Sequence, residues 1–182
     1  PPPADVLDPA PPDQPDRNLA PDAKAIQSFT GLRFAPDGGR LYMSDVQGGV
    51  KVFSVAGGRV RPSHTIPLPP ADAPGRAAEI PSGIALSADG ARLYVCANLS
   101  NRLLEIDVAT RAVLRTFAAG VAPFDVALAG GKAFVSNWGG RRPGPGDTTG
   151  PAGRGTRVRV DPRTHIASEG SVTVIDLATG DS

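Results

Sequence analysis

The sequence is poor in the residues that most often carry chemistry or cross-link a fold. It holds one cysteine, Cys96, and two histidines, His64 and His165. One cysteine cannot form an internal disulfide, and neither histidine has the HExxH spacing or a nearby second ligand of a zinc site. The GxSxG pattern of a nucleophile elbow is also absent. We therefore expect no catalytic residues, no cofactor site and no metal site within this chain.

Charge of one sign and long apolar runs are lacking as well. The 19 Lys and Arg residues nearly balance the 18 Asp and Glu residues, which leaves a formal net charge of +1. This balance argues against nucleic acid as a partner, because a nucleic-acid site needs clustered positive charge. Without a run of about 18 apolar residues, the sequence predicts no membrane span. Glycine (22) and proline (20) are plentiful instead, which is typical of short strands joined by many turns.

One stretch, at 81–117, contains four short apolar segments in succession. Residues 83–87, 92–97, 103–108 and 113–117 alternate apolar side chains with others, and ADG, NLSN and ATR stand between them. Alternation with period two predicts β-strands, and the intervening residues are those that turns require. The stretch therefore predicts a meander of four antiparallel strands.

The same pattern recurs on both sides with a period of about 40 to 45 residues, which is typical of a β-propeller blade. Pro123 repeats Pro81, and 171–179 repeats 102–110. We predict an all-β partial β-propeller of about three four-stranded antiparallel blades. The predicted blades lie at 29–68, 81–120 and 121–182, the last without its final strand, after a proline-rich disordered leader at 1–28. We expect a fragment of a larger, seven-bladed propeller, since propellers close with about four to eight blades.

Two insertions depart from the repeat, at 62–80 and at 138–169. The first is rich in proline, and the second is rich in glycine and carries six arginines against three acidic residues. Strand parity places both at one end of the blades, which makes that end the expected binding face. Trp138 is there either a stacking platform or an anchor of its own loop, and the arginines are either an anion clamp or a solvated surface. The candidate binding residues are Asn137, Trp138, Arg141, Arg142, Asp147 and Arg163.

Short motifs add a family resemblance. The segments YMSD at 42–45, YVCAN at 94–98 and FVSN at 134–137 resemble the Tyr-Val-Thr-Asn strand that names the bacterial YVTN family of β-propellers. More narrowly, SNWGGRRP at 136–143, with GDTT at 146–149 and VDPRT at 160–164, resembles the subgroup whose propeller precedes an alkaline-phosphatase-like phosphoesterase domain. The resemblance implies an exported protein, periplasmic or extracellular. Relative to the motif, Cys96-Ala97 adds one residue, which predicts a bulge in that strand.

Two functions remain open from the sequence. The first is a binding module, the N-terminal part of a larger exported protein, that presents the two insertions to a downstream domain of the intact chain or to an anionic small ligand. The second is part of a propeller or phosphoesterase hydrolase, lactonase-like or alkaline-phosphatase-like, whose catalytic residues lie outside this chain. The innermost strands favour the binding module, because they offer Thr30, Arg33, Ser82 and Asp125 but no cluster of histidine or glutamate. Exposed edge strands of an unclosed propeller would also allow the fragment to self-associate.

Overall fold

The structure is a computed structural model that describes residues 31–152 and 156–182. Every regular element in these residues is a β-strand, and none of the described residues is helical. The all-β prediction is confirmed. The predicted leader at 1–28, together with Thr30 and Arg154, lies outside the described residues.

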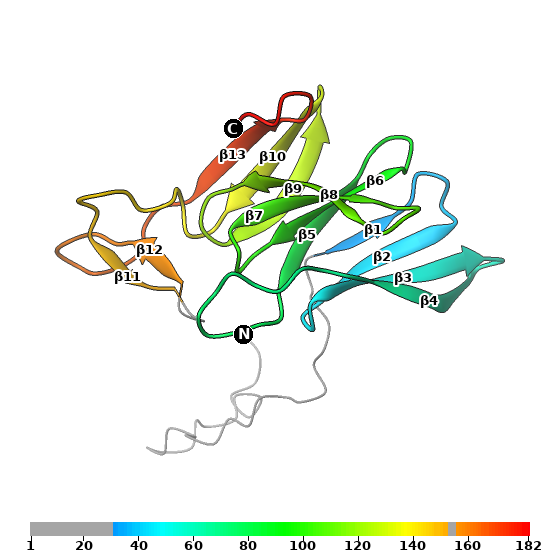
Figure 1. Cartoon of the computed structure of the whole chain (residues 1–182), viewed down its shortest axis with the longest axis horizontal. Helices are drawn as coiled ribbons and strands as arrows, with labels where there is room; N and C mark the ends of the chain where they lie inside the picture. The colour runs from blue at the N-terminus through cyan, green and yellow to red at the C-terminus, as the bar shows by residue number, and fades with distance from the viewer. Residues whose placement is uncertain (1–30, 153–155) are drawn as a thin grey trace, which may run out of the picture.

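The first two sheets are four-stranded meanders, in which each strand pairs antiparallel with the next along the chain (Figure 1). The first sheet, blade one, contains β1 (Leu32–Phe34), β2 (Arg40–Asp45), β3 (Gly49–Ala56) and β4 (Arg59–Pro67). The second sheet, blade two, contains β5 (Pro81–Leu86), β6 (Arg92–Ala97), β7 (Arg102–Asp107) and β8 (Val113–Ala118).

Blade three contains β9 (Pro123–Ala129), β10 (Lys132–Asn137) and β13 (Ser171–Asp176), paired in that order. Between β10 and β13 the chain leaves the blade and forms a separate two-stranded sheet of β11 (Thr149–Pro151) and β12 (Arg157–Arg159). Figure 1 shows this small sheet to one side of the blades. The second insertion is therefore not an irregular loop throughout, because its middle is a short hairpin.

Two recurring turns end the strands, and both are visible in the sequence. After the first strand of blades one and two, Gly38 and Gly90 each have a φ of 70°, a left-handed conformation that glycine adopts without steric cost. After the third strand, Asp107 and Asp176 each accept hydrogen bonds from the backbone N–H groups two and three residues later. These carboxylates satisfy the turn backbone and so fix where the strand ends.

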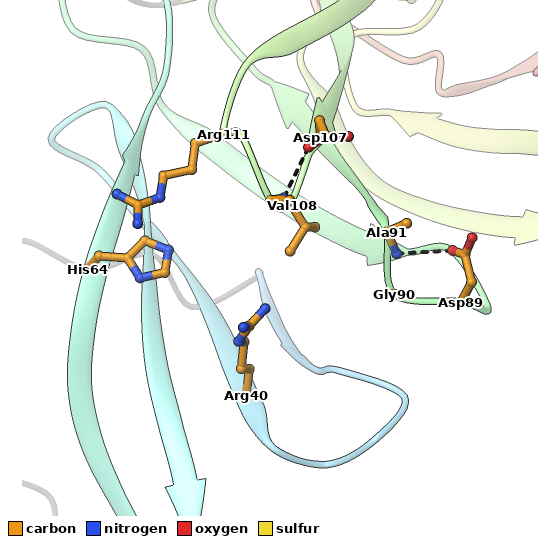
Figure 2. Close-up of a pocket in the computed structure, with 9 residues that line it drawn as sticks. Arg40, His64, Asp89, Gly90, Ala91, Asp107, Val108 and Arg111 are labelled. Carbon is orange, nitrogen blue, oxygen red and sulfur yellow. Dashed lines mark hydrogen bonds between the residues drawn. The ribbon is translucent and has the colours of Figure 1, made fainter.

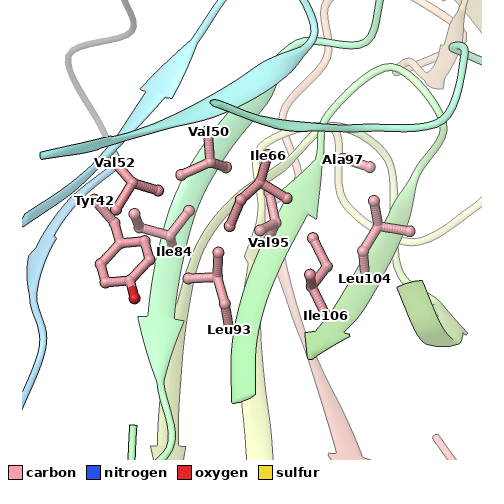
Figure 3. Close-up of a cluster of buried hydrophobic side chains, with 10 residues drawn as sticks. All are labelled: Tyr42, Val50, Val52, Ile66, Ile84, Leu93, Val95, Ala97, Leu104 and Ile106. Carbon is pink, nitrogen blue, oxygen red and sulfur yellow. The ribbon is translucent and has the colours of Figure 1, made fainter. Parts of the chain in front are cut away.

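Two apolar clusters join the blades, one on each face of blade two. Strand β6 shows why, since successive side chains of a strand point to opposite faces. Leu93 and Val95 pack toward blade one, as Figure 3 shows, whereas Tyr94 and Cys96 pack toward blade three. All four side chains are 5% exposed or less. Burial on both faces explains the unbroken apolar run of this strand, and it raises the pKa of the Cys96 thiol, which therefore stays protonated.

The sheets thus follow one another face to face in chain order, which is how blades are arranged in a propeller. The first strands of blades two and three approach especially closely. A Cβ atom added to Gly83 of β5 would lie 2.3 Å from Oδ1 and 2.4 Å from Cα of Asp125 in β9. The prediction of a partial β-propeller of about three blades is confirmed.

Two details of the prediction are wrong. The extra residue of blade two lies in β5 rather than in β6, because Pro81 pairs with Ala97 and Ile84 with Val95, which leaves two residues opposite Cys96. In addition, the first predicted insertion begins too early. Its residues up to Pro67 belong to β4, and Pro62 is accommodated because β4 is the outer strand of its blade and has an irregular register there.

Candidate functional site

The two long connections meet at one end of the blades, which we call the loop face. It comprises 68–80, between β4 and β5, the turn 98–101 between β6 and β7, and 138–170, between β10 and β13. Both connections contact the turn. In the first, the N–H of Asp72 donates to Ser100 Oγ at 2.9 Å, and in the second Arg142 donates to the carbonyl oxygen of Asn101. Strand parity therefore located the two connections correctly relative to each other.

Glu79 anchors the first connection. Its side chain is buried, and its Oε1 accepts hydrogen bonds from the N–H groups of Leu99 (2.9 Å) and Ile80 (2.8 Å). Its Oε2 accepts from the hydroxyl of Ser100 at 2.5 Å. A buried carboxylate with several donors holds backbone firmly, because each donor would otherwise lack a partner. This residue was not among the predicted site residues, since a glutamate in a proline-rich segment carries no recognisable signal.

Asp147 has the same role in the second connection. It accepts two parallel hydrogen bonds from the guanidinium of Arg141, at 2.8 and 2.9 Å. It also accepts from Arg159 Nε at 2.9 Å and from the N–H of Gly144 at 2.7 Å. These donors, Arg141 first and Gly144 next, hold the pKa of Asp147 well below its usual range. Two of the candidate binding residues, Arg141 and Asp147, are thus brought together as an internal brace of the loop.

The other predicted arginines differ in their surroundings. Arg142 donates from Nε to the carbonyl oxygen of Ala119 at 2.7 Å, in addition to its contact with Asn101, so it ties the loop to blade two. Arg163 lies in an exposed turn, where its backbone N–H donates to Asp161 Oδ1 at 2.8 Å. Within the described residues, no contact joins the Arg163 side chain to Asp147 or to Trp138.

Trp138, the first residue after β10, forms the most exposed apolar feature of the loop face. Its indole stacks on the ring of Phe124 with a centroid distance of 4.4 Å and an interplanar angle of 9°. Trp138 nevertheless remains 70% exposed. One face of the indole is therefore supported by Phe124 while the other is open, which is the arrangement of an aromatic platform.

Phe124 is oriented by a bulge at the start of β9. Ser136 pairs with Asp125 and Asn137 with Pro123, so Phe124 is the extra residue of this strand. In blade two, Ser82 and Gly83 together lie opposite Cys96, so β5 also has one extra residue next to the equivalent proline. The inner strands of blades two and three thus share a bulge at the same place. No pattern in the sequence indicates that Phe124 and Trp138 meet, because the bulge sets their geometry.

Asn137 lies beneath this platform and is only 2% exposed. Its side-chain amide nitrogen contacts the hydroxyls of Thr173 (3.0 Å) and Ser171 (3.1 Å) and the carbonyl oxygen of Val135 (3.2 Å). Its Oδ1 has no hydrogen-bond partner in the described part of the chain. Asn137 therefore joins β10 to β13 and lies below the surface that a ligand would touch.

The loop face presents a stacked aromatic pair beside a braced, arginine-rich loop. Such a surface can bind a flat or apolar group, with Arg141 still 53% exposed at its rim. Among the described residues, no group of three or more His, Cys, Asp or Glu side chains could hold a metal ion. No helix in the same residues is long and apolar enough to cross a membrane.

No protein-family model and no curated protein matches the sequence. Solved structures are similar in fold. Hydrazine synthase of Kuenenia stuttgartiensis is 19% identical and matches 92% of this chain and 50% of its own, with a TM-score of 0.50. A luciferin-regenerating enzyme is 22% identical over 60% of this chain and 37% of its own, with a TM-score of 0.49.

The β-propeller domain of Cps50 (Swd1) from Myceliophteria thermophila is 18% identical over 59% of this chain and 35% of its own, with a TM-score of 0.49. The chain therefore spans 50% of the length of the hydrazine synthase chain and 37% of the length of the luciferin-regenerating enzyme. At such identities the likeness concerns the fold alone, and a propeller can host many unrelated activities. The arrangement of its sheets shows that the chain is an all-β partial β-propeller.

Proposed function

We propose that the chain is a binding module of a larger propeller protein and that the loop face is its working surface. The observation that carries the proposal is the stack of Trp138 on Phe124. An indole that is 70% exposed and held flat by a second ring is costly to leave in water, and binding that covers it recovers this cost. The rigid bracing of the flanking loops supports the same proposal, because little conformational entropy is lost when a braced surface binds.

The proposed occupant is a further domain of the intact protein, in keeping with the resemblance to YVTN propellers that precede a phosphoesterase domain. The proposal includes export to the periplasm or the cell exterior. A flat or apolar group of that domain would cover the free face of Trp138, and an acidic group would lie near Arg141, which keeps about half of its surface exposed (53%) despite its bond to Asp147. An anionic small ligand is the alternative occupant.

The hydrolase alternative receives less support from the described residues. Its site would lie among the inner strands, where Arg33 donates to the carbonyl oxygen of Ile84 at 3.1 Å and approaches Asp125 at 3.9 Å. The first contact links blade one to blade two and the second links blade one to blade three, and the inner strands described hold no pair of groups set up as a nucleophile and its base. Whether the intact protein is an enzyme then depends on residues beyond this chain.

Site-directed photo-crosslinking in the full-length protein tests the proposal. A photoreactive phenylalanine analogue replaces Trp138 in one variant and Leu114, an exposed apolar residue of β8 in the middle blade (47% exposed), in the control. We expect position 138 to form adducts with residues that follow residue 182 in the full-length protein, and position 114 to form far fewer. Equal adduct yields at the two positions would contradict the proposal, and adducts to a small ligand alone would select the alternative occupant.

A further inference from the structure

A second candidate site lies at the opposite end of the blades, where the strands are joined by short turns. A pocket of ≈350 Å³ opens there between blades one and two. Its polar side chains come from β2, β4, the β5–β6 turn, and the end of β7 with its following turn: Arg40, His64, Asp89, Asp107 and Arg111. The pocket shares no residue with the loop face, so it is independent of the proposed function.

Three potentially cationic groups converge in this pocket. Figure 2 shows the guanidinium of Arg111 beside the imidazole of His64, with Arg40 reaching toward them from β2. Neither arginine has a carboxylate partner in the described part of the chain. Like charges repel at short range, so a cluster of this kind is favourable only when an anion balances it.

The two carboxylates of the pocket, Asp89 and Asp107, are already hydrogen-bonded to other groups. Asp107 accepts from Arg92 at 2.5 Å and from the N–H of Thr110 at 2.8 Å. Asp89 accepts from the hydroxyl of Ser87 at 2.5 Å and from the N–H of Ala91 at 3.0 Å. Figure 2 shows the turn contacts of both carboxylates on the side of the pocket away from His64. Neither carboxylate forms an ion pair with Arg40 or Arg111 in the described residues.

Backbone strain at Arg111 is a second, independent observation. The turn that follows β7 has the same hydrogen bonds as the turn that follows β13, in which the N–H of Gly180 donates to Asp176 O at 2.7 Å, as Arg111 does to Asp107 O. The fifth residue of each turn, counted from its aspartate, has a left-handed backbone conformation, with φ of 84° at Gly180 and 65° at Arg111. Glycine suits this conformation, whereas arginine is strained in it. The guanidinium of Arg111 is thus carried by a backbone conformation that glycine would adopt without strain.

We propose that this pocket is a binding site for a phosphate-type oxyanion, held by Arg40 and Arg111 with His64 as a third donor. Guanidinium groups pair with such oxyanions through parallel hydrogen bonds, and two of them match a doubly charged tetrahedral ion. The ligand is either the free ion or the phosphate group of a small ester. The pocket is open to solvent, so both can enter.

The protonation of the His64 imidazole provides a specific test for a bound anion. Its pKa is lowered by burial first, and then by the positive charges of Arg111 and Arg40. Asp89 and Asp107 face the same pocket, and Ser63 Oγ lies 3.0 Å from His64 Nδ1. An anion bound between the arginines would stabilise the imidazolium and raise this pKa. Affinity for the anion should accordingly increase as the pH falls through the pKa of His64.

The test uses the full-length protein and two kinds of titration. Calorimetry measures the binding of inorganic phosphate, glycerol 3-phosphate and acetate. NMR follows the His64 ring, assigned with His64→Gln, in sulfate, whose charge is constant where histidine titrates. Arg111→Gly is the key variant, because it removes the guanidinium while relieving the strained φ, and Arg40→Gln is the second. The matched control is Arg59→Ala/Arg61→Ala, which removes two exposed arginines of β4 outside the pocket.

We expect saturable phosphate binding that weakens about tenfold or more in Arg111→Gly and in Arg40→Gln, but not in the control. Arg111→Gly should retain or raise the melting temperature, which separates binding from folding. Tighter binding of glycerol 3-phosphate than of phosphate assigns the site to an ester, and the reverse order assigns it to the free ion. The proposal is overturned if phosphate does not bind, if acetate binds as tightly, or if sulfate leaves the pKa of His64 unchanged.

Discussion

Ser82 of blade two donates its hydroxyl to the carbonyl oxygen of Pro123 in blade three, at 2.7 Å. Asn98, also of blade two, donates its side-chain amide to the same oxygen at 3.1 Å. One carbonyl at the start of an inner strand thus receives two donors from the preceding blade. Ser44, in β2 of blade one, likewise donates its hydroxyl to the carbonyl oxygen of Ser82 in the inner strand of blade two. Side chains of one blade are therefore bonded to the inner strand of the next, in addition to the apolar clusters.

This shared acceptor predicts non-additive energetics. Ser82→Ala or Asn98→Ala alone should lower the free energy of unfolding by about 1 kcal/mol or less, since Pro123 O keeps one donor. The double variant should lose more than the sum of the two, because a buried carbonyl is then left without a partner. Urea unfolding of the four proteins in the cycle measures the difference. Additive effects would show that the two donors act independently.

The close approach of β5 to β9 predicts a sharp cost for one methyl group. The added Cβ of Gly83→Ala would lie 2.4 Å from Asp125 Cα, so one inner strand must move. We expect a loss of about 1–3 kcal/mol in the free energy of unfolding. Gly170→Ala is the control, because its nearest neighbour would be the carbonyl oxygen of Asn137 at 3.7 Å, an ordinary contact. Similar melting temperatures for the two variants would contradict the packing described for the inner strands.

Asp147 is predicted to hold the second connection in its shape. Asp147→Ala removes the carboxylate partner of Arg141, whereas Arg159 keeps its ion pair with Glu169. Trypsin should therefore cleave after Arg141 faster than in the wild-type protein. The blades themselves should melt at nearly the same temperature, because the loop lies outside their core. Asp72→Ala, which removes an exposed ion pair with Arg102 from the first connection, serves as control. Unchanged cleavage in Asp147→Ala would mean that other contacts order the loop.

The same carboxylate predicts a pH dependence. Its pKa is lowered in the folded loop, mainly by hydrogen bonds from Arg141 and Gly144. The stabilisation is therefore complete above the pKa of an unfolded aspartate, about 3.9, and is lost as the pH falls through the lower, folded value. The protection factor of the Gly144 amide, which is corrected for the intrinsic pH dependence of exchange, should be retained at pH 4 and lost only in stronger acid. Loss of this protection already near pH 5 would rule out Asp147 as the group responsible.

The repeat made the fold predictable, because each blade satisfies its backbone with its own meander and marks its turns with Asp and Gly. Alternation located the strands of blade two well, and strand parity located both long connections at one end. The bulge in β5 and the start of the first connection were misplaced. Both errors arise where register, rather than composition, decides the outcome: a proline is allowed in β4 only because that strand is at an edge.

The site was less predictable than the fold. Trp138 and the pair Arg141 and Asp147 were recognisable from residue type. Their contacts were not, since Phe124 meets Trp138 only through a bulge and Glu79 acts through backbone N–H groups. Arg142 also binds two carbonyl oxygens of the protein itself. Replacing it would loosen the loop, so Arg142 is a poor choice for testing ligand binding.

Exposed apolar side chains at the outermost strands predict self-association of the 182-residue chain produced alone. Leu32 and Phe34 of β1 are 51% and 58% exposed, and Val172 and Val174 of β13 are 62% and 41% exposed. Unpaired strand edges with apolar side chains favour pairing with another copy. Size-exclusion chromatography should show a concentration-dependent shift that Val172→Lys/Val174→Lys reduces. A monomer at all concentrations would contradict this expectation.

The claim that the loop face docks another part of the protein is tested most directly by hydrogen exchange of the full-length protein carrying Trp138→Ala. Trp138 is 70% exposed, so its loss should barely change the melting temperature of the blades. We predict that residues beyond residue 182 of the full-length protein lose amide protection in Trp138→Ala and keep it in the matched variant Leu114→Ala, which changes a 47% exposed residue of the middle blade. If Trp138→Ala changes exchange only within its own loop, the indole is an anchor of that loop and the loop face is not a docking surface.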